Sequence, residues 1–248
     1  MKAFFNWSGG KDSALALYYA QRSGQYSIEK LLTNINGAHR RISMHGVREE
    51  LLELQAEAIG LPLQKIILPE EPSMQEYEST MKKAVEELHN EKFTHAFFGD
   101  IFLEDLKIYR EQQLSKACIE CIFPLWKADT TTLMKEFLEL GFKTIVVCVN
   151  EKFLDKSFCG RIIDEDFLKD LPGNVDACGE NGEFHTFVFD GPLFQHRINF
   201  TKGEIVYKKY KAPKQQSDNC FQTTADNDYG FYFCDLLQAQ PVIFAKNL

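Results

Sequence analysis

Six residues near the start of the chain have the types and the order of a phosphate-binding loop. The motif consists of Ser8, Gly9, Gly10, Lys11, Asp12 and Ser13. It follows a short apolar run and precedes a helical pattern, and at such a turn free backbone N–H groups and the helix dipole attract phosphate. The glycines let the backbone approach the anion, Lys11 adds a positive charge, and the serines offer hydroxyl groups as donors or as a helix N-cap. The motif predicts nucleotide binding, with a small-residue turn before a buried helix as the alternative.

The loop differs from the Walker A motif. That motif has four residues between its glycines and ends in Gly-Lys-Ser or Gly-Lys-Thr, and it holds the nucleotide for transfer of the terminal phosphoryl group. Here the two glycines are adjacent, and Asp12 follows the lysine. The pattern therefore favours a different use of the nucleotide.

An aspartate at a predicted strand end is the second candidate group. Gly99 and Asp100 follow the apolar run at residues 95–98, and ligands of open α/β sheets bind at the carboxyl ends of parallel strands. A carboxylate there is suited to hold Mg2+ against the phosphates, with Asp12 as a second ligand, or to orient an acceptor. Capping of the next helix is the alternative role for Asp100. Arg110 is a candidate for contact with charged substrate groups, or a surface residue of an amphipathic helix.

A loop in the second half carries two glutamates. Glu180 and Glu183 flank Asn181 and Gly182, and His185 follows on a strand-like run. Because the two middle residues are flexible, both carboxylates are able to approach one bound cation or ammonium ion. A solvated turn is the alternative for the glutamates. His185 is a candidate proton carrier facing the cleft, with a satisfied histidine at the edge of the core as the alternative.

Met44 and His45 lie in the connection after the second predicted strand. An apolar methionine and a loop backbone suit the face of a purine, so both residues are candidates for nucleotide binding. A plain loop histidine is the alternative for His45.

The elements that position these groups follow an alternating pattern in the first half of the chain. Short apolar runs alternate with longer amphipathic stretches, which is typical of βαβ units and a parallel sheet. Strands are predicted at 2–6, 28–34, 63–68 and 95–98, with helices from about 11 to 22, at 47–59, 73–90 and 106–116. The fold class is therefore α/β, with a Rossmann-like parallel sheet and flanking helices.

The pattern changes in the second half. A helix near 133–140 and a strand at 144–149 come first, and strand-like runs follow at 184–189, 197–200, 204–210 and 231–237. Asp190–Pro192 and Lys202–Gly203 are predicted turns, and residues 211–229 are predicted to form a loop or a poorly ordered segment. We expect two domains, a nucleotide-binding α/β domain at residues 1–128 and a smaller mixed α+β substrate domain at residues 129–248.

The composition narrows the classes of partner. A net charge of −8 argues against a nucleic-acid partner. No apolar run is long enough to span a bilayer, so no membrane partner is expected. Seven cysteines at irregular spacing and the lack of a signal-peptide pattern favour reduced thiols and a cytoplasmic protein. The sequence leaves open whether the chain forms a homodimer.

Together these motifs resemble those of a known family. The hexapeptide resembles the pyrophosphate loop of the N-type ATP pyrophosphatases, which have a HUP-type fold. With Gly99-Asp100, residues 178–186, the Tyr109-Arg110 pair and residues 41–47, it resembles the diphthine-ammonia ligase family in a short, bacterial-type form. The resemblance covers nearly the whole chain to about Phe194.

The resemblance implies an activity. ATP is cleaved between its α and β phosphates, a carboxylate of a protein side chain or a small metabolite is adenylated, and ammonia converts it to an amide. The implied cofactors are ATP and Mg2+, and the implied catalytic residues are Lys11, Asp100, Glu180 and Glu183. A tRNA-modifying ATP pyrophosphatase and a non-catalytic ATP-binding regulator are the alternatives.

The chain departs from the family pattern at two positions. The family usually has Glu-Gly-Gly-Glu, an aromatic residue and Glu, whereas this chain has Asn181 and His185 at two of those positions. Eukaryotic members are also expected to carry extra C-terminal domains, for which 248 residues leave no room. ATP cleavage is therefore predicted more firmly than the acceptor.

Overall fold

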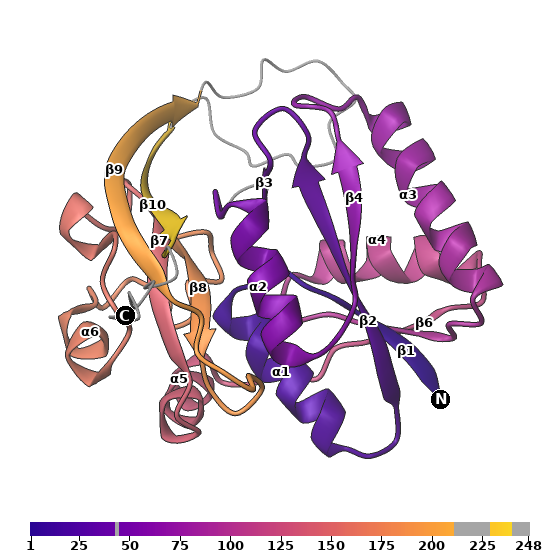
Figure 1. Ribbon diagram of the computed structural model, residues 1–248. Coiled ribbons are helices and arrows are strands. Elements are labelled where there is room, and N and C mark those ends of the chain that lie inside the picture. The colour runs from indigo at the N-terminus through magenta and orange to yellow at the C-terminus, as the bar shows by residue number, and fades with distance from the viewer. Residues whose placement is uncertain (43–44, 211–228, 240–248) are drawn as a thin grey trace, which may run out of the picture.

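The computed structural model describes residues 1–42, 45–210 and 229–239, which form a mostly parallel sheet, an antiparallel sheet and their helices (Figure 1). The helices are α1 (Lys11–Arg22), α2 (Glu49–Ile59), α3 (Met74–Asn90), α4 (Glu104–Ser115), α5 (Thr130–Glu139) and α6 (Glu165–Asp170), with a 3-10 helix at Lys156–Phe158. The strands are β1 (Lys2–Asn6), β2 (Ser27–Asn36), β3 (Arg41–Ile42), β4 (Leu63–Leu68), β5 (His95–Phe97), β6 (Glu120–Ile122), β7 (Lys143–Asn150), β8 (Phe184–Asp190), β9 (Phe200–Tyr210) and β10 (Tyr229–Gln238).

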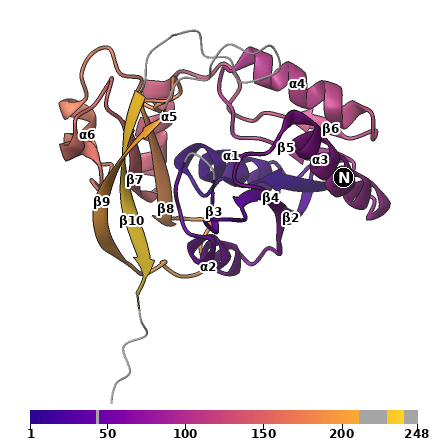
Figure 2. The same cartoon turned by 90° about the horizontal axis from the view of Figure 1, so that it is seen from above.

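The first sheet has the strand order β3-β2-β1-β5-β6, and β4 also pairs with β2. All pairs are parallel except the short β2–β3 pair. Helices α1 and α2 lie on the face toward the second sheet, and α3 and α4 cover the other face (Figures 1 and 2). Because β1 and β5 are parallel neighbours, the loop after β1 and the residues after β5 meet at one edge of the sheet. The predicted Rossmann-like α/β fold is confirmed.

The second sheet is antiparallel, with the strand order β8-β7-β10-β9. Helix α6 lies on its outer side, away from the first sheet (Figure 1). The predicted smaller α+β part is therefore confirmed, while its expected boundary at residue 129 stays a prediction. None of the helices in the described ranges is long and apolar enough to cross a membrane.

The two sheets share one buried apolar cluster that passes through α1 and α2. It includes Phe5 on β1, Leu17 on α1, Leu51 on α2, and Ile145 and Phe187 on the second sheet, all fully buried. A second cluster fills the space under α3 and α4. Burial of large apolar side chains is the main favourable contribution to folding, so the shared cluster holds the second sheet against α1 and α2.

The second half contains one clear error of the sequence analysis. Lys202–Gly203 is not a turn between two strands, because it lies inside β9, which pairs with β10 on both sides of the glycine. The register shifts between Cys234 and Leu236, opposite the glycine. A glycine within a strand pattern here marks a bulge in the ladder, not a reversal of the chain. Most of the expected loop at 211–229 falls outside the described residues.

A polar contact also fastens the first sheet to the second. Asp235 on β10 accepts hydrogen bonds from Arg48, at 2.7 and 3.0 Å, and from Arg41 on β3, at 2.9 Å. The Arg48 hydrogen bonds, followed by those of Arg41, lower the pKa of Asp235 to about 2. The contact fixes both ends of the connection that carries His45.

Replacing Asp235 with Asn tests this contact. The folded pKa lies below the unfolded value, so the stabilisation is complete above about pH 4 and is lost as the pH falls through about 2. We expect Asp235→Asn to lower the free energy of unfolding by about 1 kcal/mol at pH 7, since solvent partly screens these incompletely buried ion pairs. Urea unfolding followed by circular dichroism from pH 7 to pH 2 measures the difference.

The matched control is Asp170→Asn, which removes the carboxylate of an exposed ion pair with Arg161. It is expected to change stability by less than about 0.5 kcal/mol. An Asp235→Asn penalty that is equally large at pH 2 and pH 7 would contradict the ionic origin of the contact.

Candidate active site

The phosphate loop connects β1 to α1, with Gly10 as the N-cap residue of the helix. The hydroxyl groups of Ser8 and Ser13 lie 2.7 Å apart, and the Ser8 hydroxyl also accepts from Gly10 N–H. The N-cap makes no side-chain hydrogen bond. The two serines therefore brace the loop across its mouth and do not act as the helix cap.

Gly9 packs against helix α2. Its φ is +77°, and a Cβ at this position would lie 2.7 Å from Oε1 of Gln55 and 2.9 Å from Leu52. A side chain here would collide with the scaffold behind the loop, so the need for glycine comes from packing and from the backbone conformation. Close approach of an anion, the reason for the glycines that the sequence suggests, stays a prediction.

Gln55 is a site residue that the sequence analysis missed. It is fully buried, its Nε2 donates to the carbonyl oxygens of Gly9, at 3.0 Å, and Val188, at 2.6 Å, and its Oε1 accepts from the indole of Trp7 at 2.9 Å. Val188 N–H also donates to Gly9 O at 2.9 Å. Gln55 thus joins β1, the phosphate loop, α2 and β8. A glutamine within an apolar helical face was the only signal in the sequence.

Lys11 is buried beneath the loop that precedes β8. Its Nζ donates to the carboxylate of Asp12 and to the carbonyl oxygen of Cys178, and its backbone N–H donates to Thr186 Oγ1 at 3.0 Å. Burial alone would lower the pKa of Lys11, but Asp12 and the other nearby acidic groups raise it. The lysine is therefore a fixed positive charge at the start of α1.

Three carboxyl groups meet beside Lys11. Asp12 lies on the first turn of α1, Asp100 follows β5, and Glu180 comes from the loop before β8. Burial, then Asp12 and Asp100, raise the pKa of Glu180 to about 7, and the carboxylate accepts a hydrogen bond from Ile101 N–H. Burial also raises the pKa of Asp100, against the opposing effect of Arg110. The structure therefore brings Glu180 to the same edge of the sheet as Asp12 and Asp100, a juxtaposition that the sequence did not predict.

The surroundings of Asp100 decide between its two candidate roles. A Cβ on Gly99 would lie 2.9 Å from Ser13 N, so this glycine lets the end of β5 approach the first turn of α1. The N-cap residue of α4 is Leu103, so Asp100 does not cap that helix. Asp100 instead forms an ion pair with Arg110, whose guanidinium also lies over the ring of Phe98 at 4.3 Å. Arg110 therefore lies next to the carboxyl cluster, and its role in substrate contact stays a prediction.

The two glutamates of the 178–186 segment point to different places. Glu183 is fully buried, and its carboxylate accepts from the backbone N–H groups of Asp176 and Asn181 and from the Asn181 side chain. Gly182, at φ +81°, accepts from the side chain of Asn150. In this geometry Glu183 folds the loop that carries Glu180, and only Glu180 joins the acidic cluster. A shared cation between Glu180 and Glu183 does not match this arrangement.

His45 and His185 stack on one another, with ring centroids 4.6 Å apart and planes 25° apart. Nδ1 of His45 lies 3.3 Å from the carbonyl oxygen of Thr186. The His45 ring also lies 3.1 Å from the position that a Cβ on Gly10 would take, so the ring covers the phosphate loop. Met44, the other residue predicted beside the purine, falls outside the described residues.

Comparison with known families matches the chain in two parts. Residues 1–121 match the diphthamide synthase N-terminal domain, and residues 129–215 match the diphthamide synthase C-terminal domain. The chain belongs to the diphthamide synthase family. The family resemblance predicted from the motifs is therefore confirmed.

Similar proteins in this family are named diphthine–ammonia ligases. That of Danio rerio is 28% identical over 223 residues, which cover 80% of this chain and 86% of the relative. That of Homo sapiens is 25% identical over 222 residues, which cover 80% of this chain and 82% of the relative. That of Schizosaccharomyces pombe is 26% identical, with 86% of this chain and 39% of the relative covered. The expected extra length of eukaryotic members therefore holds for the S. pombe relative and not for the other two.

Gln55→Leu is expected to destabilise this member of the diphthamide synthase family. The change leaves the Trp7 indole and the Val188 carbonyl oxygen buried without partners, at a cost of about 2–5 kcal/mol in the free energy of unfolding. Guanidinium unfolding measures the loss. Gln64→Leu, on β4, is the matched control, because Gln64 bonds only with the part-exposed side chains Lys30 and Glu87. Equal effects of the two variants would contradict the role given to Gln55.

Glu180→Gln is expected to stabilise the protein at high pH. A carboxyl group whose folded pKa is raised to about 7 makes the folded state lose stability as the pH rises from about 4.5 through 7. Glutamine removes that penalty and keeps an acceptor for Ile101 N–H. We expect a gain of about 1–2 kcal/mol at pH 8, after allowance for partial exposure, and none at pH 4. Unfolding curves at both pH values test this, and a gain of the same size at pH 4 would refute it.

Proposed function

We propose that this chain converts a carboxylate to an amide, using ATP to form an acyl adenylate and ammonia as the nucleophile. At the level of its family, the chain is an ATP-dependent amide-forming ligase. The observation that carries the finer proposal is the meeting of Lys11 and α1 with Asp12, Asp100 and Glu180 at one edge of the parallel sheet. Lys11 and the N-terminus of α1 are suited to bind phosphates. The carboxyl groups are suited to bind a cation and a nitrogen nucleophile.

The residues present fit a Mg2+ ion. Asp12 raises the pKa of Asp100, and both raise that of Glu180, so a cation bound between these carboxyl groups would relieve their mutual repulsion. Mg2+ uses one or two carboxylates together with substrate phosphates and water. Asp12 and Asp100 would hold the ion, which would offset the charge on the phosphates. The protein would supply two of the ligands, and the substrate phosphates and water would supply the others.

The phosphate loop and Lys11 are suited to hold the β and γ phosphates, so that pyrophosphate is the leaving group. The acceptor carboxylate attacks the α phosphorus, the bond to the bridging oxygen breaks, and pyrophosphate departs. Arg110 is held by Asp100 beside this point and can offset charge on the α phosphate. Ammonia then attacks the acyl carbon, and AMP leaves with the former carboxylate oxygen.

Glu180 is the candidate base for the nucleophile. Its pKa of about 7 lets it accept a proton near neutral pH, which a carboxyl group with an ordinary pKa does poorly. Ammonium gives up one proton before attack, and the tetrahedral intermediate gives up another. The acidic cluster also favours the approach of an ammonium ion. The carboxyl groups around Glu180 thus raise its pKa to the range needed for a base in the attack of ammonia on the acyl adenylate.

The test is a screen of carboxylate acceptors with ATP, Mg2+ and ammonium. The acceptors are small metabolite acids and a protein bearing diphthine, and the readouts are AMP, pyrophosphate and the mass change for replacement of a carboxyl hydroxyl by an amino group. Lys11→Ala and Asp100→Ala are each expected to lower AMP formation by about 100-fold or more. Lys83→Ala, at an exposed position of α3, is the control.

Three outcomes would contradict the proposal. AMP formation that survives both substitutions in folded protein would remove these residues from the site. ATP binding without pyrophosphate release for every acceptor would favour a non-catalytic regulator. Activity on tRNA, with no activity on carboxylates, would favour the tRNA-modifying alternative, which the family assignment disfavours.

A further inference from the structure

The stacked histidines contain an unusual polar atom. Within the described residues, Nε2 of His185 is the buried side-chain nitrogen or oxygen that has no hydrogen-bond partner. A buried polar group without a partner is costly, and such groups in native structures call for a partner supplied by a ligand or water. The atom lies on the ring that stacks on His45, which in turn covers Gly10 of the phosphate loop.

The hydrogen bond of His45 fixes its tautomer. The Thr186 carbonyl oxygen is an acceptor only, so Nδ1 of His45 carries the proton that it donates there. With that bond made, the ring is oriented by a backbone atom of β8. His185 lies one residue before Thr186, so both rings are positioned by the same strand. The pair therefore connects the segment before α2, which carries His45, to β8 of the second sheet. This connection lies next to the phosphate loop.

The charges around the pair select the kind of ligand. The groups that act on His185 are His45 and Lys11, and those that act on His45 are Thr186 O and Lys11. Burial, with Lys11, lowers the pKa of His45 to about 4 and holds that of His185 well below its usual value. Two neutral imidazoles next to a fixed positive charge offer hydrogen-bond donors without a carboxylate. A group that fits there carries negative charge.

We propose that the His45–His185 pair is a binding site for a polyphosphate oxygen, and that anion binding draws a proton onto the pair. This inference rests on the proposed use of ATP at the adjacent loop. A phosphate oxygen supplies the missing partner of His185 Nε2 and balances the charge of Lys11. A bound anion favours the imidazolium form, so the pair takes up a proton on binding. Affinity therefore rises as the pH falls toward the pKa of the occupied pair.

The residue at position 185 sets the charge of this site. A neutral imidazole at this position places no negative charge beside Lys11, whereas a carboxylate there would repel phosphate. The pair is thus expected to make polyphosphate binding in this chain pH-dependent.

Calorimetric titration with ATP and Mg2+, with inorganic pyrophosphate and with AMP tests the proposal. His185→Phe keeps the stacked ring and removes Nε2, so the dissociation constants for ATP and pyrophosphate are expected to rise about tenfold or more, with little change for AMP. The double variant His45→Asn with His185→Gln keeps N–H donors at both positions. It is expected to retain affinity at pH 8.5 within about threefold and to lose proton uptake.

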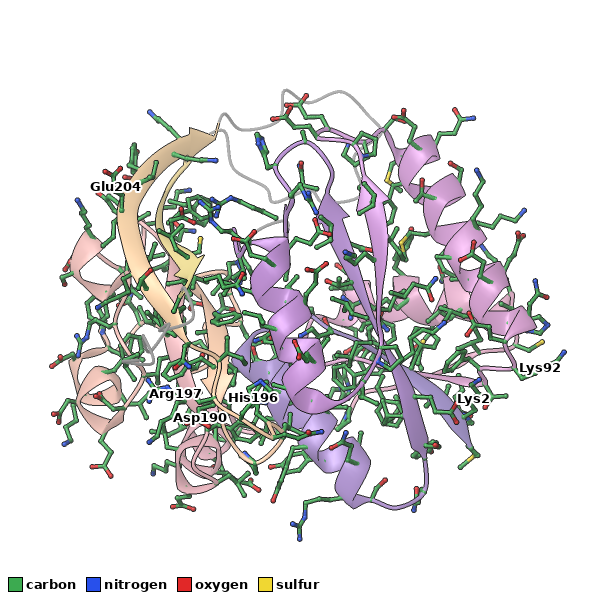
Figure 3. The ribbon with its side chains drawn as sticks, viewed as in Figure 1. Lys2, Lys92, Asp190, His196, Arg197 and Glu204 are labelled. Carbon is green, nitrogen blue, oxygen red and sulfur yellow. The ribbon has the colours of Figure 1, made fainter. Side chains whose placement is uncertain are left out.

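Proton uptake is measured from the dependence of the binding enthalpy on the ionisation enthalpy of the buffer, at pH 6.5. The control is His196→Gln. His196 is exposed on the loop after β8, where Figure 3 labels it with Asp190 and Arg197. We expect this variant to bind and to take up protons as the wild type does.

The outcomes separate this inference from the proposed function. Equal ATP affinity of the wild type and of His185→Phe overturns the inference alone. Wild-type binding with no buffer-dependent enthalpy also overturns it. Wild-type protein that binds neither ATP nor pyrophosphate overturns both the inference and the proposed function.

Discussion

The backbone of Gly9 is the point on which the site depends. Its carbonyl oxygen receives Val188 N–H from β8 and Nε2 of Gln55 from α2, so one atom of the phosphate loop joins both sheets. The loop is therefore completed by residues almost 180 positions later in the sequence. Since the apolar cluster around α1 and α2 also continues into the second sheet, the loop and the core are held by the same packing. A phosphate loop of this shape requires the second sheet to be docked.

Lys11 divides the site into two halves of different charge. On one side Asp12 raises the pKa of Asp100, and both groups raise the pKa of Glu180. On the other side the neutral pair of His45 and His185 faces the loop. Burial of a charge is costly without a partner, and Asp12 with the Cys178 carbonyl supplies one for Lys11. The acidic half suits a cation and the conversion of ammonium to ammonia. The imidazole half suits the polyphosphate anion that the proposed reaction would cleave.

The local sequence pattern predicted most strands of the first sheet and the candidate residues Lys11, Asp12 and Asp100 at the ends of its strands. The Lys2–Asn6 and Leu63–Leu68 strands and the Gly60 stop of α2 follow from apolar periodicity and turn chemistry, and these are local properties. Gln55 was missed because its partners Gly9 and Val188 are distant in sequence. The Lys202–Gly203 error has a similar origin, since only pairing with β10 distinguishes a bulge from a turn. Tertiary contacts decide both cases.

The two departures from the family pattern differ in consequence. The side chain of Asn181 donates to Glu183 within its own loop, so this change serves the loop that carries Glu180. His185 faces His45 and the phosphate loop, and it changes the charge next to Lys11. Loop packing acts on the site only through the position of Glu180, whereas a side chain beside Lys11 sets the charge that the phosphate loop presents. Of the two positions, His185 is therefore the one that bears directly on the charge of the site.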